Sequence, residues 1–268
     1  MALIDSTKHA EQEQVLSNVE PSRRAFLKKS GAYATALGAL STSGSVFAAS
    51  NGAPTLTLST EWDKTFDKSD KVEHKKVSYK TRYGITLVAD LYVPINITGK
   101  HAALAVSGPF GAVKEQSSGL YAQTMAERGF ITLAFDPSYT GESSGEPRNV
   151  ASPDINTEDF SASVDFLGSL PNVDRERIGV IGICGYSGMA LTAATSDPRI
   201  KAVATASMYD MSRSMSRSYK DSYTMEERHK VMDYLGQQRW ADVDRGSYGL
   251  GYHEVPFDDN GNIVTGER

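Results

Sequence analysis

The chain has 268 residues, of which 40% are hydrophobic and 23% are charged, and its formal net charge is −5. These values are ordinary for a globular protein and leave room for one sizeable core, so we expect a single folded domain. The negative charge argues against a nucleic-acid partner, because phosphate binding needs clustered positive charge. With one cysteine, the chain can form no intrachain disulfide.

The N-terminus has the pattern of a twin-arginine signal peptide. Arg23 and Arg24 are followed by a modestly apolar stretch over residues 31–46 and by small residues before a predicted cleavage after Ala48 or Ala49. The apolar stretch is too short and too rich in Ser, Thr and Gly to span a bilayer of about 30 Å, which disfavours a membrane anchor. We therefore expect the twin-arginine export machinery as a partner and a periplasmic or secreted protein.

The predicted organisation has three parts. Residues 1–49 form the signal peptide, residues 50–75 a polar linker and residues 76–268 one α/β domain. That domain begins with two strand patterns, Lys76–Lys80 and Ile85–Val93, joined by a four-residue turn. This spacing predicts an antiparallel hairpin.

Four apolar runs follow the hairpin and alternate with helical patterns. Near-continuous hydrophobicity is typical of parallel strands that are covered on both faces. The order of strands and helices therefore predicts a doubly wound, mostly parallel sheet. The runs are Ala102–Ser107, Phe130–Phe135, Ile178–Ile183 and Lys201–Ala206, and the helices are expected over Lys114–Arg128, from Thr157 to Leu170 and over Ser187–Ser196.

The third apolar run breaks into a glycine-rich turn with Cys184 at its tip. The spacing of Gly182 and Cys184, followed by a helical pattern, fits the sharp strand-turn-helix that exposes a nucleophile above a sheet. Tyr186 stands where a small residue is usual, so Ser187 is a rival nucleophile. We favour Cys184, because the strand ends directly at it. Its alternative role is that of a small buried hydrophobic residue.

The loop after the first apolar run is expected to supply oxyanion donors. Acyl transfer needs backbone N–H groups where negative charge develops, and one of them usually comes from this loop. Glycine and proline give the loop an exposed backbone near the turn. The predicted donors are the N–H groups of Phe110 and Gly111, together with that of Gly185. An ordinary strand-to-helix turn is the alternative for this loop.

Several motifs together resemble those of bacterial α/β hydrolases related to dienelactone hydrolase, over the chain from about Val77 onward. The resemblance implies an esterase-like or lactonase-like protein with an α/β-hydrolase-type doubly wound sheet, a cysteine in the nucleophile position and no required cofactor. We expect its partner to be a small-molecule acyl substrate. The motifs are Arg82–Ile85, Val113–Gln116, Asp136–Arg148, Gly182–Cys184 and Met208–Ser212.

The acid and base of such a site are harder to find. No strand pattern follows Ala206, and residues 208–238 read as a helical cap segment, so we expect the last two strands of the fold to be lacking. The candidates are His253 as base and Asp210 as acid. In the polar loop after the second run, Asp136 and Glu142 are expected to cap and solvate rather than to catalyse.

The sequence therefore predicts an exported hydrolase of ester, lactone or related acyl bonds. Two alternatives stay open, namely a truncated and catalytically impaired hydrolase and an exported binding protein without turnover. Without further strands, the last apolar run would form an exposed sheet edge, from which we expect self-association.

Overall fold

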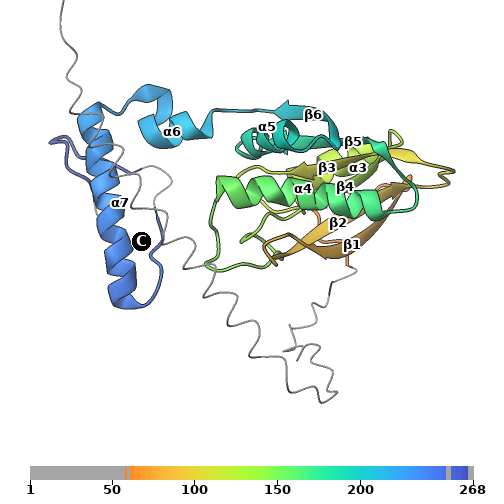
Figure 1. Cartoon of the computed structure of the whole chain (residues 1–268), viewed down its shortest axis with the longest axis horizontal. Helices are drawn as coiled ribbons and strands as arrows, with labels where there is room; N and C mark the ends of the chain where they lie inside the picture. The colour runs from red at the N-terminus through yellow and green to blue at the C-terminus, as the bar shows by residue number, and fades with distance from the viewer. Residues whose placement is uncertain (1–57, 59–60, 252–254, 265–268) are drawn as a thin grey trace, which may run out of the picture. The chain divides into compact units, whose positions relative to one another are not determined.

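The computed structural model describes residues 58, 61–251 and 255–264 and contains a six-stranded sheet (Figure 1). The predicted signal peptide and His253 lie outside these residues. In chain order the strands are β1 (Val72–Lys80), β2 (Thr86–Pro94), β3 (His101–Ser107), β4 (Ile131–Phe135), β5 (Val173–Ile183) and β6 (Ile200–Ala206).

The sheet has the spatial strand order β1-β2-β4-β3-β5-β6. Strands β1 and β2 form an antiparallel hairpin, and β2 pairs antiparallel with β4. Strand β3 pairs in parallel with both β4 and β5, and β5 pairs in parallel with β6. The predicted hairpin and the predicted mostly parallel, doubly wound sheet are both confirmed.

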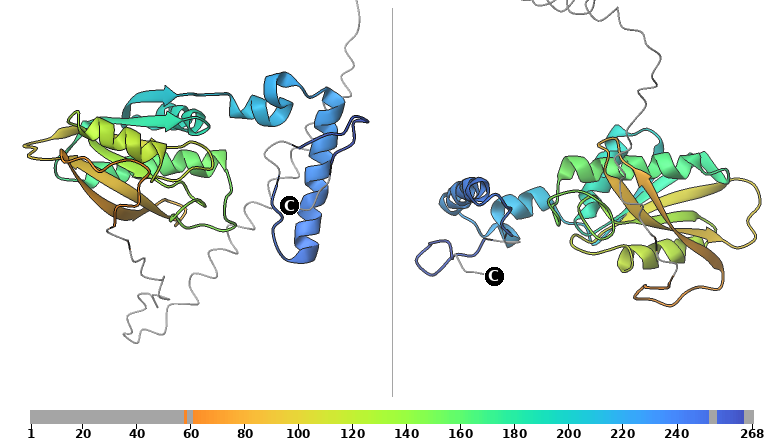
Figure 2. Two further views of the ribbon diagram at one scale, coloured as in Figure 1. Left: turned by 180° about the vertical axis from the view of Figure 1, so that it is seen from behind. Right: turned by 90° about the horizontal axis from the view of Figure 1, so that it is seen from below.

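Helices α3 (Ser117–Ala126), α4 (Pro153–Ser169) and α5 (Tyr186–Ser196) cover the two faces of the sheet (Figure 2). Along β3, Ala105 contributes to the core cluster that holds Phe160 and Met189. The next residue, Val106, contributes to the opposite cluster with Ala122. Successive strand residues thus serve opposite faces. The other described helices are α6 (Met211–Arg217), the 3-10 helix η1 (Tyr219–Asp221) and α7 (Met225–Arg245).

Two helices begin at residues other than those expected. Helix α4 starts at Pro153 rather than at Thr157, because proline has its φ fixed near the helical value and needs no hydrogen-bond partner in the first turn. Helix α3 starts at Ser117 rather than at Lys114, since Lys114 is held in a buried ion pair outside the helix.

Among the described strands, β6 lies at the edge of the sheet and pairs with β5 alone. The side chains from Lys201 to Thr205 are exposed, including Val203 at 37%. Beyond β6, the described residues contain helices and one isolated bridge between Phe257 and Ile263. None of the described helices is both long enough and apolar enough to cross a bilayer.

The segment before β1 packs against α3. The Thr65 N–H donates to the Glu115 carbonyl at 3.0 Å, and Gln123 of α3 exchanges hydrogen bonds with Ser69 and Asp67. Part of the segment predicted as a polar linker is therefore docked on the sheet domain, beside the loop that leads into α3.

Candidate active site

The turn between β5 and α5 holds Cys184 in a left-handed backbone conformation. Its φ is +56°, which is costly for a non-glycine residue and is typical of functional turns. The Cys184 N–H donates to the Ala206 carbonyl at 2.8 Å, and the side chain is half-buried. A Cβ on Gly182 would lie 2.6 Å from the Cα of Ser187, so this sharp turn requires glycine there.

Ser187 occupies a different environment from Cys184. It is fully buried on the first turn of α5, and its hydroxyl donates to the Gly182 carbonyl at 2.8 Å. This bond uses the hydroxyl proton within the turn itself and points the oxygen away from solvent. The geometry thus favours Cys184 over Ser187 as the group presented to a substrate.

The predicted oxyanion loop lies against this turn. A Cβ on Gly108 would come within 2.3 Å of the Ile183 carbonyl oxygen, so the loop makes a close backbone approach to the end of β5. A Cβ on Gly185 would lie 3.1 Å from the Cβ of Phe110. Phe110 and Gly185 are therefore neighbours, and Gly111, with φ of +80°, follows Phe110 in the same loop.

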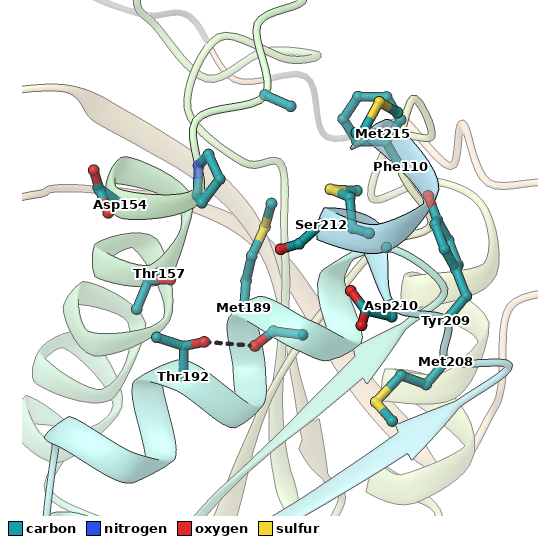
Figure 3. Close-up of a pocket in the computed structure, with 15 residues that line it drawn as sticks. Phe110, Asp154, Thr157, Met189, Thr192, Met208, Tyr209, Asp210, Ser212 and Met215 are labelled. Carbon is teal, nitrogen blue, oxygen red and sulfur yellow. Dashed lines mark hydrogen bonds between the residues drawn. The ribbon is translucent and has the colours of Figure 1, made fainter. Parts of the chain in front are cut away.

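A cavity of about 730 Å³ opens beside the turn (Figure 3). Four of the side chains that line the cavity are methionines, and the exposed lining is largely apolar. Such a lining suits a flexible apolar ligand group. The lining residues are Phe110, Ala151, Pro153, Asp154, Thr157, Gly185, Gly188, Met189, Thr192, Met208, Tyr209, Asp210, Met211, Ser212 and Met215.

Tyr209 brings a polar group to this cavity. A Cβ on Gly185 would lie 3.3 Å from its hydroxyl oxygen. Burial raises the pKa of Tyr209, and the nearby Cys184 adds to the increase, so the hydroxyl keeps its proton near neutral pH. Tyr209 was not among the predicted site residues, although it lies three residues after the end of β6, near the carboxyl edge of the sheet where sites form.

The predicted acid lines the cavity, but it also has a structural role. Asp210 is the N-cap of α6, and its Oδ1 accepts a hydrogen bond from the Arg213 N–H at 2.9 Å. The predicted base, His253, is outside the described residues. No histidine within the described ranges lines the cavity. The described residues also contain no cluster of three or more His, Cys, Asp or Glu side chains fit for a metal ion.

The expectation of solvated carboxylates after β4 was wrong for Asp136. Asp136 has no exposed surface and pairs with Lys114, whose side chain is 1% exposed, at 2.9 Å. Burial raises the pKa of Asp136, and the Lys114 ammonium opposes that rise. No local pattern signals this pair, because Lys114 and Asp136 meet only through the parallel pairing of β3 with β4.

The fold and the turn at its carboxyl edge define the class as an α/β hydrolase fold. The α/β hydrolase GrgF from Penicillium sp. sh18 has a similar structure, with a TM-score of 0.58 and 23% identity over 71% of this chain and 61% of that one. The chain belongs to the X-Pro dipeptidyl-peptidase (S15) family, whose model matches residues 83–247.

Two relatives extend this comparison. The uncharacterized protein PA2218 of Pseudomonas aeruginosa is 66% identical over 75% of this chain and 55% of its own length. Its crystal structure has a TM-score of 0.71 at 64% identity, over 76% of this chain and 63% of that one. Thiohydrolase aneE of Aspergillus aculeatus is 32% identical over 52% of this chain and 42% of its own length. The chain thus spans about half the length of the curated relatives it matches.

Proposed function

We propose that this protein hydrolyses ester, lactone or related acyl bonds, with Cys184 as the nucleophile. The observation that carries the proposal is the left-handed turn at Cys184, which lies between β5 and α5 and beside an apolar cavity. A relative described as a thiohydrolase supports the inclusion of thioesters among those bonds. The apolar lining favours substrates with an apolar acyl group.

The proposed reaction is a two-step acyl transfer. The Cys184 thiolate adds to the carbonyl carbon, and the carbonyl oxygen takes the electron pair as an oxyanion. The N–H groups of Gly185, Phe110 and Gly111 are the proposed donors to that oxyanion. Collapse of the adduct expels the alkoxide or thiolate, which takes the proton that a base removed from the Cys184 thiol. Water then adds to the acyl-cysteine, which releases the carboxylic acid and restores the thiol. His253 is the candidate for that base and Asp210 the candidate for the acid.

The second candidate function is ligand binding without turnover. It is favoured by the lack of any cavity-lining histidine among the described residues, since a cysteine nucleophile needs a base to form its thiolate. A catalytically impaired hydrolase would share this feature. Export by the twin-arginine route and a particular likeness to dienelactone hydrolases are further parts of the proposal, and both rest on the sequence patterns alone.

A substrate panel tests the proposed function. The purified chain is assayed with a p-nitrophenyl ester, an acyl thioester and an X-Pro anilide, as wild type, Cys184→Ala and Ser187→Ala. We expect turnover of the ester and the thioester that Cys184→Ala abolishes and Ser187→Ala largely retains. Loss of ester and thioester turnover in Ser187→Ala but not in Cys184→Ala would identify Ser187 as the nucleophile. Binding of an acyl ligand without turnover would favour the binding protein, and turnover of the anilide alone would favour a peptidase.

A further inference from the structure

A buried ion pair joins the loop after β3 to the loop after β4. The Lys114 ammonium lies 2.9 Å from Asp136 Oδ2, and the Lys114 backbone N–H donates to Asp136 Oδ1 at 2.8 Å. One carboxylate therefore holds both the backbone and the side chain of Lys114. The two side chains are 1% and 0% exposed, so water competes little for these contacts.

Further charges surround the pair. Lys114 Nζ also contacts Glu115 Oε1 and Glu142 Oε2, each at 2.5 Å. Lys76 of β1 reaches the same Glu142 oxygen at 3.0 Å. The Glu142 N–H donates to Asp136 Oδ2 at 2.9 Å. This cluster of two lysines and three carboxylates connects β1 with the loops that follow β3 and β4.

Stability alone does not explain such a cluster. Replacing a buried ion pair with well-packed apolar side chains is often neutral or stabilising, because charges lose hydration on burial. What the pair adds is a set of hydrogen bonds in fixed directions, which Asp136 accepts from the backbone and side chain of Lys114 and from the Glu142 N–H. The site is shaped to hold the carboxylate, since a Cβ on Gly141 would lie 2.2 Å from Asp136 Oδ2.

The pair fixes one end of the oxyanion loop. At the other end, Gly108 makes its close approach to the Ile183 carbonyl, next to Cys184. The intervening residues include Phe110 and Gly111. The segment is therefore held at Gly108 by the turn and at Lys114 by Asp136, and its N–H groups lie between two fixed points.

We propose that the Lys114–Asp136 pair positions the Phe110 and Gly111 N–H groups over Cys184. This inference rests on the proposed function and deepens it by assigning a positioning role to two residues that do not touch the substrate. If the pair is lost, the loop relaxes and carbonyl addition slows, while the thiol keeps its own reactivity. Removal of one oxyanion donor typically costs about 100- to 1000-fold in rate.

The test compares two reactions of the same thiol in the full chain. Acylation by p-nitrophenyl acetate passes through an oxyanion, whereas alkylation by iodoacetamide displaces iodide and involves no carbonyl addition. The variants are Asp136→Asn and Lys114→Met, with Lys114→Arg as the conservative rescue. The control is Arg199→Met, which breaks the partly exposed ion pairs with Asp197 and Asp165 at the amino end of β6, away from the loops that follow β3 and β4.

We expect Asp136→Asn and Lys114→Met to slow acylation of Cys184 by about a hundredfold and to change alkylation less than twofold. Lys114→Arg should recover most of the acylation rate, and Arg199→Met should change neither reaction. Glu142→Gln, at a partly exposed member of the cluster, should slow acylation by a smaller factor and serves if the buried variants do not fold.

Three results would overturn the proposal. Equal slowing of both reactions would mean that the pair only maintains the fold around the thiol. Unchanged acylation in all variants, with normal acylation of the wild type, would mean that the loop is positioned without the pair. Alkylation of the wild type without any acylation would contradict the proposed function itself, and with it the positioning role of the pair.

Discussion

Replacement of Asp159 by asparagine should change how the stability of the fold depends on pH. Asp159 lies fully buried on α4, where it accepts hydrogen bonds from the N–H and hydroxyl of Ser138 and from the Asn156 amide. Burial outweighs these bonds and raises the pKa of Asp159 to about 6, from an ordinary value of 3.8.

The sign of the effect follows from proton binding. Between pH 4 and pH 6 the folded state holds the Asp159 proton more tightly than the unfolded chain does, so the free energy of unfolding falls as pH rises through this window. The difference between about 6 and 3.8 corresponds to about 3 kcal/mol in total. The loss is complete by about pH 7, one unit above the folded-state pKa, and at higher pH the stability no longer changes on account of this group.

Urea unfolding of the wild type and of Asp159→Asn, measured from pH 4 to pH 8, tests this reasoning. Titration of all other groups is common to both proteins, so their difference isolates Asp159. We expect the wild type to lose about 2.5 kcal/mol relative to the variant between pH 4 and pH 7, most of the total. Parallel stability curves would refute the raised pKa, and a wild type that gains stability with pH relative to the variant would reverse its sign.

Three further predictions concern export, association and the base. Replacing Arg23 and Arg24 with lysine should block export, and periplasmic protein in that variant, detected by fractionation, would contradict the signal assignment. Val203→Lys, on the exposed edge strand β6, should shift the chain toward monomer in sedimentation equilibrium, and an unchanged distribution would locate self-association elsewhere. His253→Ala should leave ester turnover nearly unchanged, whereas a loss of about a hundredfold would identify His253 as the general base.

The strands could be predicted because burial on both faces leaves a direct trace in the sequence. Successive side chains of β3 pack into apolar clusters on opposite faces of the sheet, so Ala105 and Val106 both have to be apolar. The turn at Cys184 could also be predicted from the sequence, because its close packing requires a glycine at position 182. These features depend on residues that are near one another in the chain.

The rest of the site depends on contacts between distant residues. Lys114 and Asp136 each have an ordinary polar context in the sequence, and only the parallel pairing of β3 with β4 brings them together. The methionines of the cavity come from α5 and from the segment around α6, which share no periodic pattern. The start of α4 was predicted one turn too late, because threonine is a common capping residue and Thr157 lies one turn after the actual start at Pro153.

The most direct test of the central claim is the intact mass of the chain after reaction with an activated acyl ester. We predict a single acyl adduct on the wild type, located at Cys184 by peptide mapping, and none on Cys184→Ala. The same adduct should form on Ser187→Ala at nearly the wild-type rate. An adduct that persists in Cys184→Ala, or a folded wild type that takes no acyl group, would contradict the assignment of Cys184 as the nucleophile.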